Sequence, residues 1–332
     1  MIPAFLGLAG CTITDEEHGF FREVNPAGYI LFKRNIDTPD QVRALTHALK
    51  ELAGSDLPIL IDQEGGRVAR LRPPHWPEFP TGETFSNTYA RAPITAIEAC
   101  RLNALALAAL LKDLGITVNC LPLLDVRDPQ AHDIIGDRAL GSEPMQVSAL
   151  GRATLDGLRQ GGVCGVIKHI PGHGRAGADS HLELPVVDAT LSALERDFEP
   201  FRRLSSAPMA MTAHVTYTAL DAGNCATLSP QVIDFIRNDI GFSGLLMSDD
   251  LGMKALSGDF GSRAEAALAA GCDIALHCSG DMAEMQAIAA ALGDIGPAAR
   301  RRLSAAMAWA GPGDDTSPAR WAEARDRLLG DA

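Results

Sequence analysis

The chain has 332 residues, of which 46% are hydrophobic and 21% are charged, and its formal net charge is −13 at pH 7. This composition is typical of a globular protein, and the length is within reach of one α/β barrel. The negative charge argues against a protein that binds duplex nucleic acid or adsorbs to anionic membranes, because both need a cationic face.

The cysteines and the apolar segments bear on the cellular compartment. The seven cysteines are an odd number, include no Cys-x-x-Cys pair and lie mostly in apolar runs, which favours reduced thiols in a reducing compartment. The N-terminal apolar run has no basic segment before it, and no stretch approaches about 18 consecutive apolar residues. We therefore expect a cytoplasmic protein without a signal peptide or a membrane span.

Short apolar runs recur along the chain, and each is almost continuously apolar, as a strand covered on both faces must be. Eight such runs are predicted strands, at residues 3–10, 28–34, 58–66, 116–126, 165–170, 209–215, 244–250 and 273–278.

Helical segments with recognisable starts lie between these runs. Thr14 with Glu17 and Ser192 with Glu195 have the S/T-x-x-E form of a capping box, and the segment 38–41 (TPDQ) combines a capping threonine, a proline and a capping-box glutamine. Ser229 and Pro230 start a further helix. The segment 94–115 carries an apolar helical face and ends on a glycine suited to the position after a helix.

Eight strands that are each followed by a helix predict a (β/α)8 TIM-type barrel of the α/β class. The competing arrangement is an open doubly wound sheet, but the Gly-x-Gly-x-x-Gly turn of its dinucleotide-binding form is missing. No repeat or linker divides the chain, so we expect a single catalytic domain over residues 1–332. A C-terminal helix at about 317–330 is expected to pack on the barrel.

Polar residues end the predicted strands, and in a TIM-type barrel the chemistry lies at the carboxyl ends of the strands. An apolar strand that finishes on carboxylates indicates acids held in a pocket, because a buried charge is costly without a partner. The strand ends carry Asp62-Gln63-Glu64 with Arg67 and Arg70, Asp125, Lys168-His169, His214, Ser248-Asp249-Asp250 and His277.

Three chemistries fit such a ring of residues. A metal-dependent hydrolase would use His169, His173, His181 and His214 with carboxylates, although the first strand lacks the His-x-His pair usual in such barrels. A Schiff-base lyase would use Lys168, but the surrounding carboxylates favour its charged form. The third chemistry is glycoside hydrolysis, in which one carboxylate attacks and another group protonates the leaving oxygen.

Four segments resemble glycoside hydrolase family 3, and in particular its single-domain bacterial β-N-acetylhexosaminidases of cell-wall recycling. The segments are LIDQEGGRVARL (60–71), IGDRALGSEP (135–144), VIKHIPGHGRAGADSHLELP (166–185) and GLLMSDDLGM (244–253). The resemblance spans most of the predicted barrel. SDDLGM departs slightly from the SDDLSM that is frequent in this branch, a difference not expected to affect the chemistry.

The resemblance implies the catalytic residues. Asp249 corresponds to the nucleophile, which forms a covalent glycosyl–enzyme intermediate with retention of configuration. His181 corresponds to the acid/base and Asp179 to its partner. A histidine suits this role because its ordinary pKa of about 6.5 allows it to donate and accept a proton near neutral pH. The glycines around His173 predict a mobile loop that brings His181 into the site when substrate binds.

The positions of sugar-binding residues correspond to Asp62, Arg70, Arg138, Lys168 and His169. For the two arginines, a salt bridge that only shapes the pocket is the alternative interpretation. For Asp250, orientation of the following loop is as good an interpretation as substrate contact, and His173 is expected to shape its loop.

The predicted function is that of a retaining exo-β-N-acetylglucosaminidase that removes terminal β-linked N-acetylglucosamine from peptidoglycan fragments. No cofactor or metal is expected, and the predicted partner is a small carbohydrate or muropeptide rather than nucleic acid or membrane. A monomer is expected. A metal-dependent barrel hydrolase, a glycoside phosphorylase on the same scaffold and a catalytically silent sugar-binding barrel remain alternatives.

Overall fold

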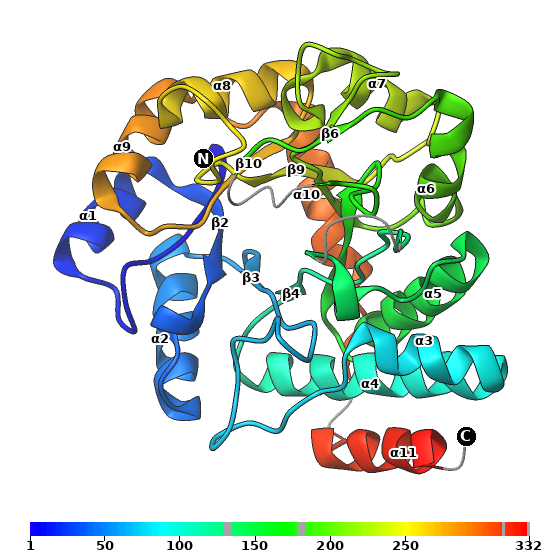
Figure 1. Cartoon of the computed structure of the whole chain (residues 1–332). Coiled ribbons are helices and arrows are strands. Elements are labelled where there is room, and N and C mark those ends of the chain that lie inside the picture. The colour runs from blue at the N-terminus through cyan, green and yellow to red at the C-terminus, as the bar shows by residue number, and fades with distance from the viewer. Residues whose placement is uncertain (129–133, 178–182, 314–315, 331–332) are drawn as a thin grey trace.

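The computed structural model describes residues 1–128, 134–177, 183–313 and 316–330. Eight parallel strands close into a barrel in the order β1-β10-β9-β7-β5-β4-β3-β2, with helices around it (Figure 1). The barrel strands are β1 (Ile2–Leu6), β2 (Pro26–Leu31), β3 (Ile59–Ile61), β4 (Val118–Asn119), β5 (Cys164–Ile170), β7 (Met209–Thr212), β9 (Leu245–Asp250) and β10 (Ile274–His277). The predicted (β/α)8 barrel is confirmed.

The strands coincide with the eight predicted runs, but several are shorter. The run at 116–126 gives only the two residues of β4, although the carbonyl oxygens of Leu121 and Pro122 still accept from β5 at 2.9 and 3.1 Å. β3 ends at Ile61, and beyond it the backbone of Gln63 binds a side chain instead of a neighbouring strand. The Asn119 amide accepts from Gln63 N at 3.1 Å and donates to Gln63 O at 2.9 Å. Two strands that the apolar pattern did not predict, β6 (Val186–Val187) and β8 (Thr216–Tyr217), form a small separate sheet.

Helices follow the barrel strands and cover the outside of the barrel (Figure 1). They are α1 (Asp15–Val24), α2 (Pro39–Ala53), α3 (Gly82–Arg91), α4 (Pro93–Asp113), α5 (Pro144–Gln160), α6 (Leu191–Arg203), α7 (Pro230–Asn238), α8 (Phe260–Ala270), α9 (Met282–Ala291), α10 (Pro297–Trp309) and α11 (Pro318–Gly330). Short 3₁₀ turns occur at η1 (Lys33–Asn35), η2 (Gly136–Arg138) and η3 (Ala226–Leu228).

The helix starts agree in part with the sequence patterns. Thr14 and Glu17 form the predicted capping box, and Ser229 caps α7. Thr38 caps α2, but the side chain of Gln41 accepts from Asp37 N at 2.8 Å instead of completing a box. The box predicted at 192–195 is wrong, since Thr190 is the N-cap of α6.

α4 is the one helix in the described part of the chain whose length and composition would suit a membrane span, but 72% of its apolar window is buried inside the protein. It packs between the barrel and α11. Its apolar surface is therefore explained by core packing, as in other internal helices.

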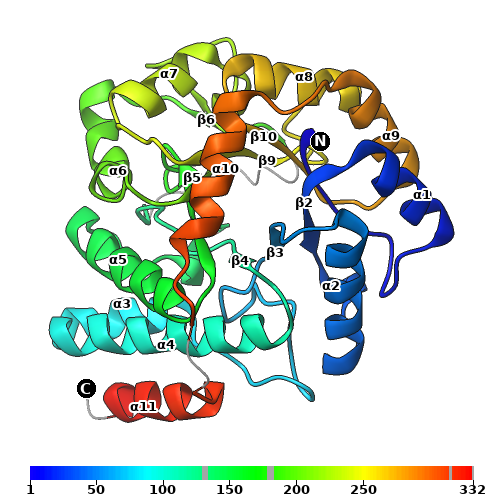
Figure 2. The ribbon, with the colours of Figure 1, turned by 180° about the vertical axis from the view of Figure 1, so that it is seen from behind.

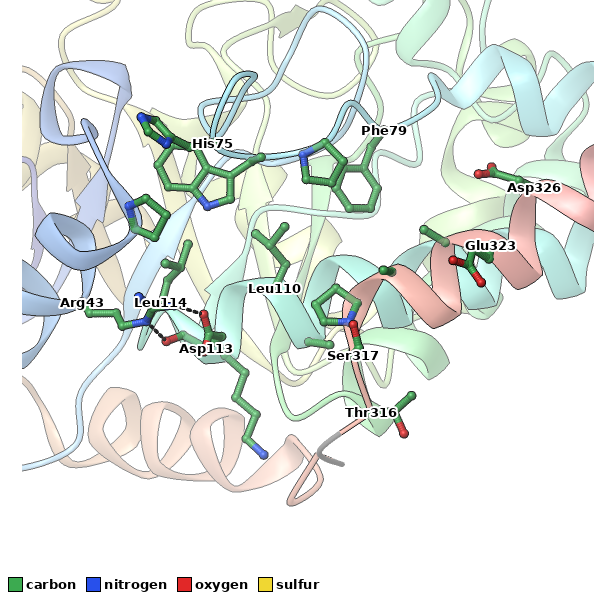
Figure 3. Close-up of a pocket in the computed structure, with 18 residues that line it drawn as sticks. Arg43, His75, Phe79, Leu110, Asp113, Leu114, Thr316, Ser317, Glu323 and Asp326 are labelled. Atoms are coloured by element: carbon green, nitrogen blue, oxygen red, sulfur yellow. Dashed lines mark hydrogen bonds and ion pairs between the residues drawn. The ribbon is translucent and has the colours of Figure 1, made fainter.

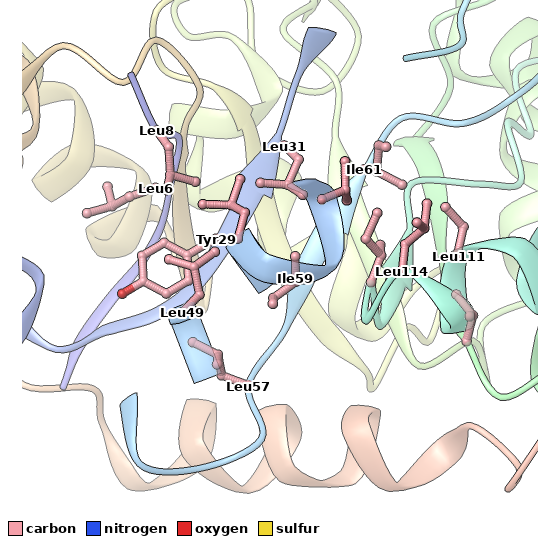
Figure 4. Close-up of a cluster of buried hydrophobic side chains, with 14 of the residues drawn as sticks. Leu6, Leu8, Tyr29, Leu31, Leu49, Leu57, Ile59, Ile61, Leu111 and Leu114 are labelled. Atoms are coloured by element: carbon pink, nitrogen blue, oxygen red, sulfur yellow. The ribbon is translucent and has the colours of Figure 1, made fainter. Parts of the chain in front are cut away.

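Alternation along the strands divides the apolar side chains between two environments. Phe5 and Ile30 point into the barrel interior, where they join Leu60 and Val166. Their neighbours on the same strands point outward and pack against α2 and α4. Figure 4 shows this outer cluster, with labelled members Leu6, Leu8, Tyr29, Leu31, Leu49, Leu57, Ile59, Ile61, Leu111 and Leu114.

One end of the barrel is closed by a helix. Leu303 and Ala306 of α10 belong to the same buried cluster as the inward-facing strand residues, and Figure 2 shows α10 crossing the barrel on the side away from the viewer of Figure 1. This arrangement leaves the opposite end, where the strands have their carboxyl termini, for the polar residues.

Candidate active site

A cavity of about 260 Å³ lies at the carboxyl ends of the barrel strands. Its walls bring together residues that are far apart in the sequence. They include Ile30, Phe32, Asp62, Glu64, Arg67, Arg70, Arg138, Lys168, His169, His173, Met211, Asp249, Asp250, Met253, Leu276 and Cys278. The cavity therefore contains every sequence-predicted substrate-binding residue and the predicted nucleophile.

Lys168 lies at the centre of a buried ion-pair network. Its Nζ is 2.9 Å from Asp62 Oδ1 and 2.7 Å from Glu64 Oε1, and its side chain is only 3% exposed. Burial alone would lower the pKa of the lysine, but the two carboxylates outweigh it and hold the pKa above its ordinary value. Lys168 is therefore a fixed cation and hydrogen-bond donor, which is unfavourable for Schiff-base chemistry.

Each carboxylate of this network has an arginine as its second partner. Arg70 Nη2 is 3.0 Å from Asp62 Oδ2, while Arg138 binds Glu64 through two hydrogen bonds of 2.8 and 2.9 Å. Burial raises the pKa of both acids, but the neighbouring cations outweigh it and lower the pKa of Glu64 to about 2 and that of Asp62 further. Both acids are ionised at neutral pH.

The two arginines differ in how their guanidinium groups are used by the protein. The Arg138 fork is used by Glu64, so its position fits the interpretation of a salt bridge that shapes the pocket. Arg70 stacks on the ring of Phe32, with Cζ 5.0 Å from the ring centroid. Its Nε is buried and has no hydrogen-bond partner among the described residues, while its Nη2 binds Asp62.

The turn that carries Asp62 and Glu64 is tightly held. Gln63 is buried between them, and its Oε1 accepts from the backbone N–H groups of Arg70 and Leu71 at 2.8 and 3.0 Å. Gly65 has φ +112°, and a Cβ there would come within 2.2 Å of Pro80 O. The sequence QEGG is thus required for a turn that presents alternate carboxylates to the cavity.

Asp125 orients the histidine at the end of β5. It is fully buried, and its Oδ2 lies 2.8 Å from His169 Nδ1. Its Oδ1 accepts from the backbone N–H groups of His169 and His173 at 3.2 and 2.6 Å. Despite its burial, these contacts lower the pKa of Asp125 to about 2. An ionised Asp125 requires a proton on His169 Nδ1, so His169 Nε2 is the ring atom left for the cavity.

Asp249 and Asp250 end β9, but their surroundings differ. Burial raises the pKa of Asp249, yet neighbouring groups that include the N–H of Asp250 and the Lys168 cation outweigh it and keep the pKa below its ordinary value. Asp250 Oδ1 accepts from the backbone N–H groups of Gly252 and Cys278, both at 3.0 Å. Asp249 is thus an ionised carboxylate in the cavity wall, whereas Asp250 organises the turn after the strand.

Comparison with known proteins places this cavity in a family. Residues 6–308 match the model of the glycosyl hydrolase family 3 N terminal domain. The chain belongs to glycosyl hydrolase family 3. It is 39% identical over 282 residues to the beta-hexosaminidase of Alkalilimnicola ehrlichii, a match that covers 83% of this chain and 80% of that protein. The beta-hexosaminidase of Aromatoleum aromaticum is 34% identical over 308 residues, with coverages of 91% and 86%.

A solved structure gives the same result. NagZ from Neisseria gonorrhoeae, in complex with N-trifluoroacetyl-D-glucosamine, superposes with a TM-score of 0.88 at 29% identity, over 99% of this chain and 97% of that chain. The chain is therefore a glycoside hydrolase of the beta-hexosaminidase type. Family membership favours glycoside hydrolysis over the other two chemistries that the strand ends allowed.

Two catalytic predictions for this family 3 chain, His181 and Asp179, lie outside the described residues, as does the part of the loop predicted to carry them. The described beginning of that loop is firmly attached: Arg175 Nε is 2.6 Å from Asp197 Oδ2, and Gly174 packs against Val126 O with no room for a Cβ. His173 is buried within this base, which agrees with a role in shaping the loop.

For the metal-dependent alternative, no group of three or more His, Cys, Asp or Glu residues within the described ranges has the arrangement of a metal site. His169 is directed to Asp125, and His214 Nδ1 lies 2.7 Å from Thr227 Oγ1. The histidines of the described strand ends are therefore engaged in separate hydrogen bonds.

Glu64 and Asp125 are functional candidates that the sequence-based assignment of roles did not include. Glu64 is two residues after Asp62, and the period of two in extended backbone would place both on one face. Asp125 was among the polar strand-end residues, but its role was not assigned, because it lies six residues beyond the end of β4 and approaches His169 only through the path of the loop.

A second, larger groove of about 890 Å³ lies outside the barrel, between α2, α4, α11 and the segment 75–79 (Figure 3). Its labelled polar residues include Arg43, which pairs with Asp113 at 2.6 Å. The groove contains none of the strand-end residues, so we place the active site of this family 3 enzyme in the smaller cavity.

Proposed function

We propose that the chain is a retaining exo-β-N-acetylglucosaminidase that removes terminal N-acetylglucosamine from peptidoglycan fragments in cell-wall recycling. The observation that carries the proposal is the ionised, half-buried Asp249 in the same cavity as the Asp62–Lys168–Glu64 network. A charged nucleophile beside fixed donors and acceptors for hydroxyl groups is what glycosidic bond cleavage needs.

In the first step, Asp249 attacks the anomeric carbon as the bond to the leaving oxygen breaks, and His181 supplies the proton that this oxygen takes up. In the second step, His181 accepts a proton from water, the water oxygen bonds to the anomeric carbon, and Asp249 is released as a carboxylate. Asp179 would fix the tautomer of His181 and support its charged form. These roles rest on the family resemblance.

The sugar would be held by the residues of the ion-pair network. Asp62 can accept from sugar hydroxyls while Lys168 donates to sugar oxygens, and Arg70 holds Asp62 in place. His169 Nε2 faces the same cavity, and Arg138 supports Glu64. The NagZ structure named above binds N-trifluoroacetyl-D-glucosamine, which supports an N-acylated glucosamine as the sugar in this chain too.

A cytoplasmic location is part of the proposal. All seven cysteines are free thiols, and six of them are buried, which suits a reducing compartment. Fractionation of the source cells, followed by detection of the protein in the soluble or the envelope fraction, tests this location directly.

The activity is tested with an aryl β-N-acetylglucosaminide and with a muropeptide that carries a terminal N-acetylglucosamine. We expect release of free N-acetylglucosamine from both, with the β configuration of the first-formed product retained. Asp249→Ala should lower kcat by at least about 10³-fold, since the nucleophile is lost. An unchanged rate in this variant would refute the assignment of Asp249.

Two further assays separate the alternatives. If the products in phosphate buffer contain sugar 1-phosphate, the enzyme is a phosphorylase. If exhaustive chelation abolishes turnover and added zinc restores it, the enzyme is a metal-dependent hydrolase. Sugar binding without turnover on either substrate would indicate a silent sugar-binding barrel.

A further inference from the structure

Three buried side chains connect the backbone N–H of the proposed nucleophile, Asp249, with the backbone carbonyl of the next residue, Asp250. The backbone N–H of Asp249 donates to Thr212 Oγ1 at 3.3 Å, and Thr212 Oγ1 lies 2.7 Å from Thr227 Oγ1. Thr227 Oγ1 is 2.7 Å from His214 Nδ1, and His214 Nε2 is 3.0 Å from the carbonyl oxygen of Asp250. The side-chain circuit thus begins and ends on the backbone of the Asp249–Asp250 pair.

The direction of every hydrogen bond in this circuit follows from one fixed acceptor. A carbonyl oxygen can only accept, so the proton of His214 must be on Nε2, which donates to Asp250 O. In the neutral ring Nδ1 is then an acceptor, and it takes the hydroxyl proton of Thr227 at 2.7 Å in preference to the carbonyl oxygen of Ala213 at 3.2 Å. Thr227 Oγ1 in turn accepts from the hydroxyl group of Thr212, which accepts from the Asp249 N–H. All donors point the same way, and such chains strengthen cooperatively.

The surroundings of His214 favour this neutral form. The residue is fully buried, as are Thr212 and Thr227, and burial lowers the pKa of the imidazole below its ordinary value. His214 is two residues beyond the end of β7, and its imidazole reaches the end of β9. The imidazole therefore connects the two strand ends at the position of the nucleophile.

The circuit also affects the position of the Asp249 carboxylate, which is the attacking group. Asp249 Oδ1 already accepts from the N–H of Asp250 at 2.8 Å, so the peptide group between the two residues also fixes the carboxylate. The carbonyl bound by His214 lies on the other side of the Asp250 Cα, so its displacement would turn the backbone of Asp250 and move the N–H group that holds the carboxylate. A displacement of about 1 Å at a reacting group can cost on the order of 10²-fold in rate.

We propose that His214 is a positioning residue for the nucleophile, acting with Thr227 and Thr212 to fix the Asp249 carboxylate for attack on the anomeric carbon. Because this role depends on the proposed function of Asp249, the wild-type enzyme must first turn over 4-nitrophenyl β-N-acetylglucosaminide. A wild type without this activity would refute the proposed function, whereas the variants below test only the role of His214.

Two amide substitutions test the two nitrogen atoms of the His214 imidazole separately. In His214→Gln the amide nitrogen can replace Nε2 and donate to Asp250 O, whereas in His214→Asn the shorter amide can reach Thr227 but not Asp250. We expect kcat of the Asn variant to fall about 10- to 100-fold with KM changed less than about threefold, and the Gln variant to recover most of the lost kcat.

A second readout identifies the impaired step. Poor positioning of the nucleophile slows glycosylation rather than hydrolysis of the glycosyl–enzyme. His214→Asn should therefore lose any pre-steady-state burst of 4-nitrophenol and depend more steeply on the leaving-group pKa than the wild type does. A general loss of structural order would instead lower the active fraction without changing this dependence.

Thr227 provides an independent pair of variants for the case that His214→Asn does not fold. Thr227→Ser keeps the hydroxyl group and Thr227→Val removes it at nearly the same volume, so only the Val variant should show the drop in kcat. The positioning role is overturned if the Asn and Gln variants of His214 match each other, if kcat stays at the wild-type value in both, or if Thr227→Ser and Thr227→Val are equally active.

Discussion

Lys168 Nζ and Asp62 Oδ1 lie 2.9 Å apart in the active-site cavity, although 106 residues separate them in the chain. The ammonium group is also bound to Glu64, so one cation bridges two carboxylates that would otherwise repel each other. A permanently charged donor and an ionised acceptor are thereby held side by side, as recognition of neighbouring sugar hydroxyls requires.

Removal of the central cation should affect both stability and activity. In Lys168→Met, Asp62 and Glu64 each keep an arginine but lose their shared partner, so we expect the free energy of unfolding to fall by about 3 kcal/mol. kcat/KM should fall about 100-fold as sugar contacts are lost. Urea unfolding and aryl glycoside hydrolysis measure the two effects. Lys50→Met, on the half-exposed surface of α2, is the matched control and should change neither value appreciably.

Replacement of Asp125 should disturb His169. In Asp125→Asn the amide cannot accept at both atoms, so its NH2 group must face either the ring N–H of His169 or the backbone N–H groups that Oδ1 now serves. We expect kcat/KM to fall about 10- to 100-fold, with a loss of stability of about 2 kcal/mol. Asp234→Asn, on the exposed face of α7, is the control. Equal activity of the two variants would contradict the orienting role.

Stability should decrease on mild acidification. Burial lowers the pKa of His173 to about 4, whereas an unfolded histidine titrates near 6.5. Between these values the unfolded chain binds a proton that the folded protein does not, so the free energy of unfolding rises with pH. From pH 7 to pH 5 the loss from His173 should be about 2 kcal/mol, and the lowered pKa of His214 acts in the same direction.

Urea unfolding of wild type and His173→Gln at pH 7 and pH 5 measures this effect. The variant should lose about 2 kcal/mol less than the wild type over this interval, since its side chain does not titrate. The low pKa values of Glu64 and Asp125 stabilise the protein above about pH 4.5, and that stabilisation is lost only as the pH falls toward 2. A pH dependence that is the same in both proteins would contradict the buried neutral form of His173.

A buried arginine helps to hold the C-terminal helix, whose Trp321 and Ala322 also pack against the core. Arg325 of α11 is 5% exposed, donates to Asn103 Oδ1 of α4 at 2.7 Å and lies over the ring of Phe79. Arg325→Ala should reduce the free energy of unfolding by about 2 kcal/mol, because a buried acceptor on α4 loses its partner. Turnover per folded molecule should stay the same. Arg327→Ala, on the exposed side of α11, should be neutral in the same denaturation assay.

Much of the scaffold is determined locally by the sequence. The eight apolar runs became the eight barrel strands because a strand that is buried on both faces must be apolar throughout. Thr14 and Ser229 start helices as predicted, because a cap depends on a few neighbouring residues. Thr190 rather than Ser192 caps α6, since the two candidates are close in the sequence and the path of the preceding chain decides between them.

The residues of the cavity were identifiable from the sequence, but their partners were not. Strand-end position and family resemblance indicated Asp62, Lys168 and Asp249. The contact of Asp125 with His169 and the circuit through His214 depend on loop paths and on which strand ends barrel closure makes neighbours. Apolar periodicity and capping act within a few residues, whereas hydrogen bonds and ion pairs of a site join distant segments. The sequence by itself therefore determined the barrel and the kinds of group at its carboxyl end, and only the tertiary structure decided how those groups are paired.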